Sequence, residues 1–204
     1  MRKIAFWSAI SSYVLFLATL VIGAKNYPGY LHTSQFISEL GASGAPTEMF
    51  FRVGNFLPCG ILIMVFSFAA IKVLPKSGVT TLGFCLLAYN AFGSLTAAFF
   101  PCDFGCRPES PSVSQIIHNL VGLGGYLAAV AGLFVLAIQA RTWSGMQYLF
   151  QLGIGCGSMA FASLLLFDPG FEFTGLAQRS LEFSVGLWIL SCAWSLRKFE
   201  DVHS

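Results

Sequence analysis

Charged residues are scarce in this sequence. Of its 204 residues only 10% are Asp, Glu, Lys or Arg, whereas about a quarter are charged in an average soluble protein. The formal net charge is +2, and no cluster of basic residues is present to contact phosphate groups. The composition therefore excludes an ordinary soluble domain, and we predict no nucleic-acid partner.

Two sequence signatures of hydrolytic enzymes are missing. The sequence contains no His-x-x-x-His pair, a common arrangement of two zinc ligands on one helix. No glycine pattern of a nucleophile elbow surrounds Ser38. We accordingly predict no metal and no cofactor.

Most cysteines are placed where disulfides are not expected. Four of the six lie inside apolar runs and should pack as small hydrophobic side chains: Cys59, Cys85, Cys156 and Cys192. The other two, Cys102 and Cys106, share a polar loop on the side that we assign to the outside, where disulfides are stable. Catalytic redox pairs usually have a two-residue spacer, and this pair has three. We predict a structural disulfide between Cys102 and Cys106.

Apolar residues are abundant, at 56% of the chain. A helix needs about 20 apolar residues to cross a bilayer, and the first run is too long for the apolar region of a signal peptide. We predict an all-α fold, a polytopic membrane bundle forming a single domain over residues 1–204. Its six transmembrane helices are expected at about 4–24, 50–71, 79–100, 113–139, 146–167 and 176–196.

Two local features modify this plan. Pro58 should bend the second helix or free a backbone carbonyl. The loop after the first helix is rich in Gly, Pro, Ser and Thr, and we expect a short interfacial helix from Ser34 to Leu40 with Ser34 or Thr33 as its N-cap.

The basic residues predict the orientation. Seven lie on one side of the six-helix plan: Arg2, Lys3, Lys72, Lys76, Arg141, Arg197 and Lys198. Four lie on the other side: Lys25, Arg52, Arg107 and Arg179. Because short cytoplasmic loops carry the excess of Lys and Arg, both termini are predicted to be cytoplasmic. We expect an integral protein of a bacterial or archaeal cytoplasmic (inner) membrane, with membrane lipids as its partners.

Polar side chains gather on the predicted outer side, in three stretches that the helix plan brings to one face. The candidate catalytic residues are Ser38, Glu39, Asp103 and His118. The candidate substrate-binding residues are His32, Arg52, Asn55, Arg179 and Glu182.

The catalytic candidates allow two arrangements. In a hydrolytic triad, His118 would take the proton of Ser38 while Asp103 orients the imidazole. In a zinc site, the ligands would be His32, His118, Asp103 and Glu39, with one position open. A histidine at the outer rim is more often a hydrogen-bonding residue than a catalyst.

Arg179 needs a partner, because a charged group at membrane depth is unfavourable. Glu182 is three residues away on the same helical face and is one choice. The other is an acid from a different hairpin, Glu39 or Asp103. We predict that Glu39, Asp103, His118 and Arg179 converge in one hydrogen-bonded network.

The loop after the first helix carries the pattern Tyr-x-His-x-Ser-x-x-Ile-Ser-x-Leu-Gly-Ala, from Tyr30 to Ala42. A Phe-Pro-x-Asp sequence ends the third helix at Phe100 to Asp103, and His118 opens the fourth. With these motifs the chain resembles the microbial six-helix membrane family catalogued as domain of unknown function 998, which implies the fold and topology but no activity. The layout is more distantly similar to the alkaline ceramidases, a clan of membrane zinc hydrolases. The chain lacks the paired histidines of that clan's last helix, which argues against zinc chemistry.

The leading functional hypothesis is an outward-facing polar pocket that binds a lipid or another amphiphile, with hydrolysis or transfer as a further step. A small transporter is the alternative, favoured by Pro58 and by the intramembrane pair Arg179 and Glu182. The inner halves of the helices contain few ionisable residues, which argues against transport of a hydrophilic solute. A third hypothesis is a non-catalytic accessory or assembly partner of another membrane protein.

Overall fold

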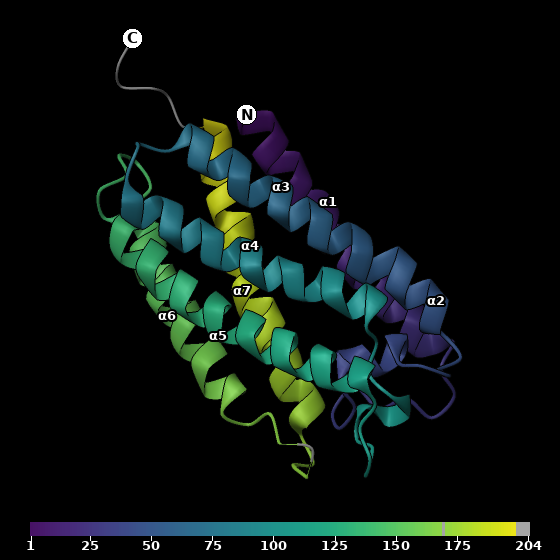
Figure 1. Cartoon of the computed structure of the whole chain (residues 1–204). Coiled ribbons are helices and arrows are strands. Elements are labelled where there is room, and N and C mark those ends of the chain that lie inside the picture. The colour runs from purple at the N-terminus through teal and green to yellow at the C-terminus, as the bar shows by residue number, and fades with distance from the viewer. Residues whose placement is uncertain (169, 199–204) are drawn as a thin grey trace.

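A computed structural model describes residues 1–168 and 170–198, and these form helices and loops without a β-strand. Six rods run roughly side by side in these residues (Figure 1). Five of them are single helices: α1 (Arg2–Lys25), α4 (Gly78–Phe99), α5 (Val113–Ala140), α6 (Tyr148–Leu164) and α7 (Thr174–Lys198). The second rod is continuous through α2 (Glu48–Phe51), η2 (Arg52–Phe56) and α3 (Leu57–Val73).

Each rod begins and ends within three residues of a predicted transmembrane helix. Local chemistry explains several ends. Ser77 and Ser112 cap α4 and α5, because their side chains accept hydrogen bonds from backbone amides of the first turn. α4 stops just before Pro101, whose preceding residue is biased away from helical backbone angles.

The apolar character of the rods fits a membrane. Four of them are long and apolar enough to cross a bilayer: Arg2–Lys25, Glu48–Val73, Gly78–Phe99 and Val113–Ala140. α6 is apolar but has only 17 residues, and α7 carries Arg179 and Glu182. Large apolar side chains on the outer surface are exposed, including Val14, Leu127 and Phe161. Such a surface is suited to lipid rather than to water.

The second rod has an irregular turn next to Pro58. The segment just before it, η2, is a π-helix in which one extra residue is inserted into the turn. The insertion lets the chain continue past the missing amide of Pro58 without a break. It also places Asn55 inside the bundle, where the side chain is 2% exposed and its Nδ2 donates a hydrogen bond to the Thr19 hydroxyl of α1.

The rods form a closed ring. Each packs mainly against its neighbours in the chain, and α7 returns to α1. The closest approaches use glycine: the ring of Tyr13 on α1 occupies the place where Gly186 of α7 would carry a Cβ. In the half of the bundle that contains the N-terminus, a large apolar cluster fills the interior, and its largest members are Phe66, Phe84, Trp143 and Trp188.

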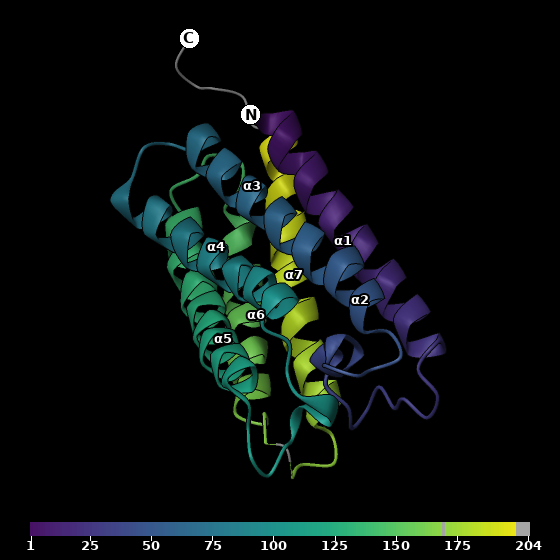
Figure 2. The same cartoon turned by 45° about the vertical axis from the view of Figure 1, so that its right-hand side comes forward.

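The three long loops lie at the end of the bundle opposite the N-terminus (Figures 1 and 2). They connect α1 to α2, α4 to α5 and α6 to α7. The first two contain short 3-10 helices, η1 (Ile37–Gly41) and η3 (Phe104–Cys106). The expected helix from Ser34 to Leu40 therefore begins three residues later than predicted, and its N-cap is Phe36.

Candidate functional site

Arg179 anchors the first long loop to α7. Its side chain is only 6% exposed, and every nitrogen of the guanidinium donates a hydrogen bond. Nη2 donates to the Tyr30 hydroxyl at 2.6 Å, and Nη1 donates to the carbonyls of Gln35 at 2.9 Å and Gly175 at 2.8 Å. Nε donates to Nδ1 of His32 at 3.2 Å. The planar fork of arginine suits this set of acceptors.

Burial next to Arg179 shifts the pKa values of two loop residues. Burial raises the pKa of Tyr30 to about 12, although the positive charge of Arg179 acts in the opposite direction. Burial and, second, the charge of Arg179 lower the pKa of His32. His32 therefore accepts with Nδ1 as a neutral imidazole, and its role is to hold the loop on Arg179.

Two further contacts tie this loop to the start of α7. The amide of Leu176, which lies in the first turn and has no partner within the helix, donates to the Thr33 carbonyl at 2.9 Å. The side chain of Gln178 accepts the amide proton of Ile37 at 2.6 Å. Gly175 allows the approach, because the backbone of Gln35 lies where a Cβ would be.

Glu39 is buried but does not pair with Arg179. Its Oε1 accepts the amide proton of Phe36 at 2.9 Å, and its Oε2 accepts from Nε2 of Gln35 at 2.8 Å. The carboxylate thus caps η1 from within the helix by binding the amide of its N-cap residue, and neither Thr33 nor Ser34 is that N-cap. Gln35 contacts both Arg179 and Glu39, and the alternative in which Arg179 meets Glu39 directly is not formed.

Asp103 organises the loop between α4 and α5. Its carboxylate accepts the amide proton of Ser112 at 2.9 Å, and this hydrogen bond lowers the pKa of Asp103. Its own amide donates to Gln115 at 2.8 Å. Asp103 contacts neither Arg179 nor His118 in the described part of the chain. The predicted convergence of four residues is therefore wrong, because each forms its hydrogen bonds with other backbone groups or with neutral side chains instead.

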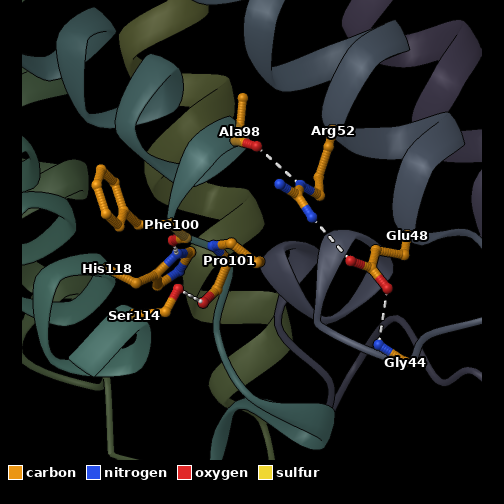
Figure 3. A network of polar contacts seen from close by, with 8 residues as sticks. All are labelled: Gly44, Glu48, Arg52, Ala98, Phe100, Pro101, Ser114 and His118. Atoms are coloured by element: carbon orange, nitrogen blue, oxygen red, sulfur yellow. Dashed lines mark hydrogen bonds and ion pairs between the residues drawn. The ribbon is translucent and has the colours of Figure 1, made fainter. Parts of the chain in front are cut away.

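Arg52 supports the end of α4 from the second rod. Its Nε donates to the Ala98 carbonyl at 2.7 Å, and its Nη1 pairs with Glu48 at 2.7 Å (Figure 3). Glu48 in turn accepts the amide proton of Gly44 at 2.8 Å. The last carbonyls of a helix have no partner within it, so Arg52 supplies one from a neighbouring element.

His118 and Ser114 support the same helix end from α5 (Figure 3). Nδ1 of His118 donates to the Phe100 carbonyl at 3.1 Å, and the Ser114 hydroxyl donates to the Pro101 carbonyl at 2.7 Å. Since a carbonyl can only accept, the proton of the neutral imidazole is on Nδ1 and its Nε2 carries a lone pair.

The hydrogen bonds of a catalytic triad are not formed. Nδ1 of His118, which Asp103 would have to orient, is used by Phe100. The Ser38 hydroxyl contacts the sulfur of Cys106 at 3.5 Å instead of an imidazole. Within residues 1–168 and 170–198, no three His, Cys, Asp or Glu side chains are grouped so that they could hold a metal ion.

Cys102 and Cys106 form a disulfide that lies against η1. The sulfur of Cys102 is 3.7 Å from the Ser38 carbonyl, and the Cys102 carbonyl accepts the amide proton of Ser43 at 2.8 Å. The bridge thus holds the second long loop against the first.

A cavity of about 120 Å³ lies inside the ring, beneath η1. Ser38 and His118 line it near the loops, and Ile63 and Ile189 line it deep in the bundle. Its polar lining comprises Ser12, Tyr13, Ser38, Asn55, Cys59, Asn90, Ser94, His118, Tyr126, Gln178 and Glu182. Four of the nine candidate site residues are therefore brought together here: Ser38, Asn55, His118 and Glu182.

A chain of hydrogen bonds runs from the loop into this cavity. Gln178, which holds Ile37 through its oxygen, donates from Nε2 to the Tyr126 hydroxyl at 2.9 Å. Tyr126 donates to Oε1 of Glu182 at 2.8 Å. The expected pair of Arg179 with Glu182 does not form, because Glu182 faces the cavity and Arg179 faces the loop.

Sequence reasoning missed several cavity residues, including Asn90, Tyr126 and Tyr13. One signal was available for the first of them. Asn90 is the only amide or charged side chain in the apolar run 79–100. A polar residue in such a run usually faces the interior of a bundle and marks a site.

One comparison with known proteins finds a match. The family model described as "Protein of unknown function (DUF998)" matches residues 10–195, which include most of all six rods. No curated protein and no solved structure matches the chain. The resemblance carried by the motif from Tyr30 to Ala42 is confirmed by this match. The chain therefore belongs to the DUF998 family of membrane-type helical proteins, whose function is unknown.

Proposed function

We propose that this protein binds the head of a lipid or another amphiphile in the cavity beneath η1. It would do so in a bacterial or archaeal cytoplasmic membrane, with the loop end facing outward. The observation that carries the proposal is the cavity itself, which lies within the ring of helices and has a mixed polar and apolar lining.

The lining suits a molecule with two kinds of surface. Hydroxyl, amide, imidazole and carboxyl groups are available to a polar head, and Phe16, Phe56, Ile63 and Val185 are available to the carbons next to it. Binding sites for small molecules usually combine an apolar wall with a few such polar groups. A free hydrophilic solute would leave the apolar part of this wall without a partner.

The inner half of the bundle favours binding over transport. Ile189 lies fifteen residues into α7, about 22 Å along the helix from its first residue. Beyond this depth the interior is filled by the cluster that contains Phe66, Phe84 and Trp143. A polar path to the end that contains the N-terminus would require this packing to separate.

Hydrolysis or transfer is a second candidate, because Ser38 and His118 line the same cavity. The lone pair on Nε2 of His118 is the base that such a step would use. Loss of turnover in both Ser38→Ala and His118→Gln, with the bound amphiphile retained, would support this step. The hydroxyl of Ser38 is directed to a disulfide sulfur, and binding alone is therefore the better supported function.

A larger side chain at Gly122 should occupy the cavity without a clash with the backbone. A Cβ built on Gly122, which lines the cavity, meets no atom within 4 Å, and the same holds for Gly155 of α6, which is exposed on the outside of the bundle. Gly122→Leu and Gly155→Leu therefore make the same chemical change in different places.

The proposal is tested by the lipids that each protein retains. Wild type and both variants are purified in dodecyl maltoside, washed extensively and analysed by native mass spectrometry. Wild type and Gly155→Leu should retain about one amphiphile per chain, and Gly122→Leu should lose it. Equal retention by Gly122→Leu, or none by wild type, would contradict the proposal.

A further inference from the structure

Glu182 is the only acidic side chain that lines the cavity in the part of the chain described by the structure. One carboxyl oxygen, Oε1, accepts the hydrogen bond from Tyr126 at 2.8 Å. The other, Oε2, has no hydrogen-bond partner among residues 1–168 and 170–198. Glu182 is half-buried, so this oxygen is available to a molecule in the cavity.

The nearby cationic side chains are engaged elsewhere. Arg179, one turn earlier on α7, uses its whole guanidinium on the first long loop. Arg52 pairs with Glu48 and with the end of α4. Glu182 therefore has no cationic partner from the described residues, although a carboxylate inside a membrane bundle is costly when it is unpaired.

The walls around Glu182 are also suited to a cation. Four aromatic side chains line the same cavity: Tyr13, Phe16, Phe56 and Tyr126. The faces of such rings attract ammonium groups, and more strongly where water is excluded. The cavity thus combines one negative side chain with several electron-rich faces, and no arginine or lysine of the described residues lines it.

We propose that the cavity selects amphiphiles whose head carries an amine or another cationic group, with Glu182 as the counter-charge. This inference rests on the function proposed above and names the class of ligand. A volume of about 120 Å³ is close to that of engineered cavities, about 150 Å³, that hold a benzene molecule. It accommodates an ammonium group and the first few carbons, while the rest of the chain must extend between helices.

Three probes with the same hydrocarbon chain isolate the effect of the head: octadecylamine, octadecanol and octadecanoate. Butylamine adds the cation without the long chain. Binding of each to the purified full-length protein in dodecyl maltoside is measured by calorimetric titration at pH 7. Wild type should bind octadecylamine at least about tenfold more tightly than octadecanol, the ratio expected for one charge-assisted hydrogen bond. Octadecanoate should bind most weakly.

Glu182→Gln removes the charge and keeps an oxygen that can accept from Tyr126. Its affinity for octadecylamine should fall by about tenfold or more, while its affinity for octadecanol stays within about twofold of wild type. Glu172→Gln is the matched control, because Glu172 is exposed in the loop before α7 and does not line the cavity. Its affinities should equal those of wild type.

The outcomes separate the two proposals. Equal binding of octadecylamine and octadecanol by wild type would overturn the cationic preference even if Glu182→Gln fails to fold, and would leave amphiphile binding in place. An unchanged affinity of Glu182→Gln for octadecylamine would overturn the role of Glu182. If none of the four probes binds to wild type, the function proposed above fails. If butylamine binds as tightly as octadecylamine, the long chain contributes nothing to binding. That result would overturn the proposal that the ligand is an amphiphile and would leave the cation site in place.

Discussion

Substitution of Arg179 by alanine should destabilise the bundle by detaching the first long loop from α7. The guanidinium is 6% exposed and donates to Tyr30, His32 and the carbonyls of Gln35 and Gly175. Leaving a buried polar group unpaired costs about 1–3 kcal/mol. The Gln35 carbonyl loses the hydrogen bond from Arg179, and together with the weakened loop contacts we expect a loss of about 3 kcal/mol in the free energy of unfolding.

Arg107 provides a matched control, because it contacts the same loop from the surface. It donates to the Ser34 carbonyl at 2.8 Å and lies over the ring of Phe36, but its side chain is exposed. Its removal should cost less than about 1 kcal/mol. For a chain of this size each kcal/mol shifts the melting temperature by roughly 2–4 °C. Arg179→Ala should therefore lower it by roughly 6–12 °C and Arg107→Ala by less than about 4 °C.

The assay is thermal unfolding of the purified protein in detergent. Samples are heated to a series of temperatures, and size-exclusion chromatography measures the fraction of protein that remains monodisperse at each temperature. Arg179→Lys should fall between wild type and Arg179→Ala, because an ammonium keeps the charge but cannot reach all the acceptors of the planar fork. Equal shifts for Arg179→Ala and Arg107→Ala would refute the view that the buried guanidinium holds the loop.

Further predictions concern topology and pH. In intact cells a membrane-impermeant maleimide should label Ser110→Cys, which is exposed in the loop between α4 and α5, and should not label Ser144→Cys at the other end of the bundle; the reverse pattern would contradict cytoplasmic termini. Because the folded-state pKa of His32 is lowered, the unfolded chain binds more protons, and stability should fall as the pH drops from 7.5 to 5 through the unfolded pKa of about 6.5. His32→Asn should reduce this pH dependence, since an amide oxygen can accept from Arg179 without titrating; an unchanged pH profile would exclude His32 as its source.

The helices of this protein could be predicted because a membrane helix requires a long, continuous run of apolar residues, which is visible in the sequence. A run of about 20 apolar residues has few alternatives in a bilayer, where backbone groups must be satisfied within the helix. The runs are bounded by local signals that can also be read from the sequence, such as Ser112 before α5 and Pro101 after α4. For this reason each rod agrees with its predicted bounds within three residues.

The partners of the polar residues could not be predicted in the same way. Charge complementarity suggested an acidic partner for Arg179, either Glu182 or one of Glu39 and Asp103. A folded loop, however, also offers carbonyls and neutral side chains that can accept its hydrogen bonds. The motif from Tyr30 to Ala42 provides several of them, since Tyr30, His32 and Gln35 all contact Arg179. Which acceptor is closest depends on how the loop packs on α7, and no pattern in the sequence specifies that packing.

The residues that line the cavity could also be predicted only in part. Asn55 and Glu182 could be proposed as site residues from the sequence, Asn55 as an extension of the polar network and Glu182 as a charged group at membrane depth. Tyr13 and Tyr126 belong to the same lining, but a tyrosine in a membrane helix is equally common at the lipid headgroups. Only the rotation of α1 and α5 about their axes brings these hydroxyls inside the ring.

A structure of the protein in nanodiscs formed with its native lipids, with a rigid antibody fragment bound to aid imaging, tests the central claim most directly. We predict elongated non-protein density whose head lies in the cavity within hydrogen-bond distance of Glu182, below Ser38 and η1. A cavity that contains only water, or that is closed by repacked side chains, would contradict the account.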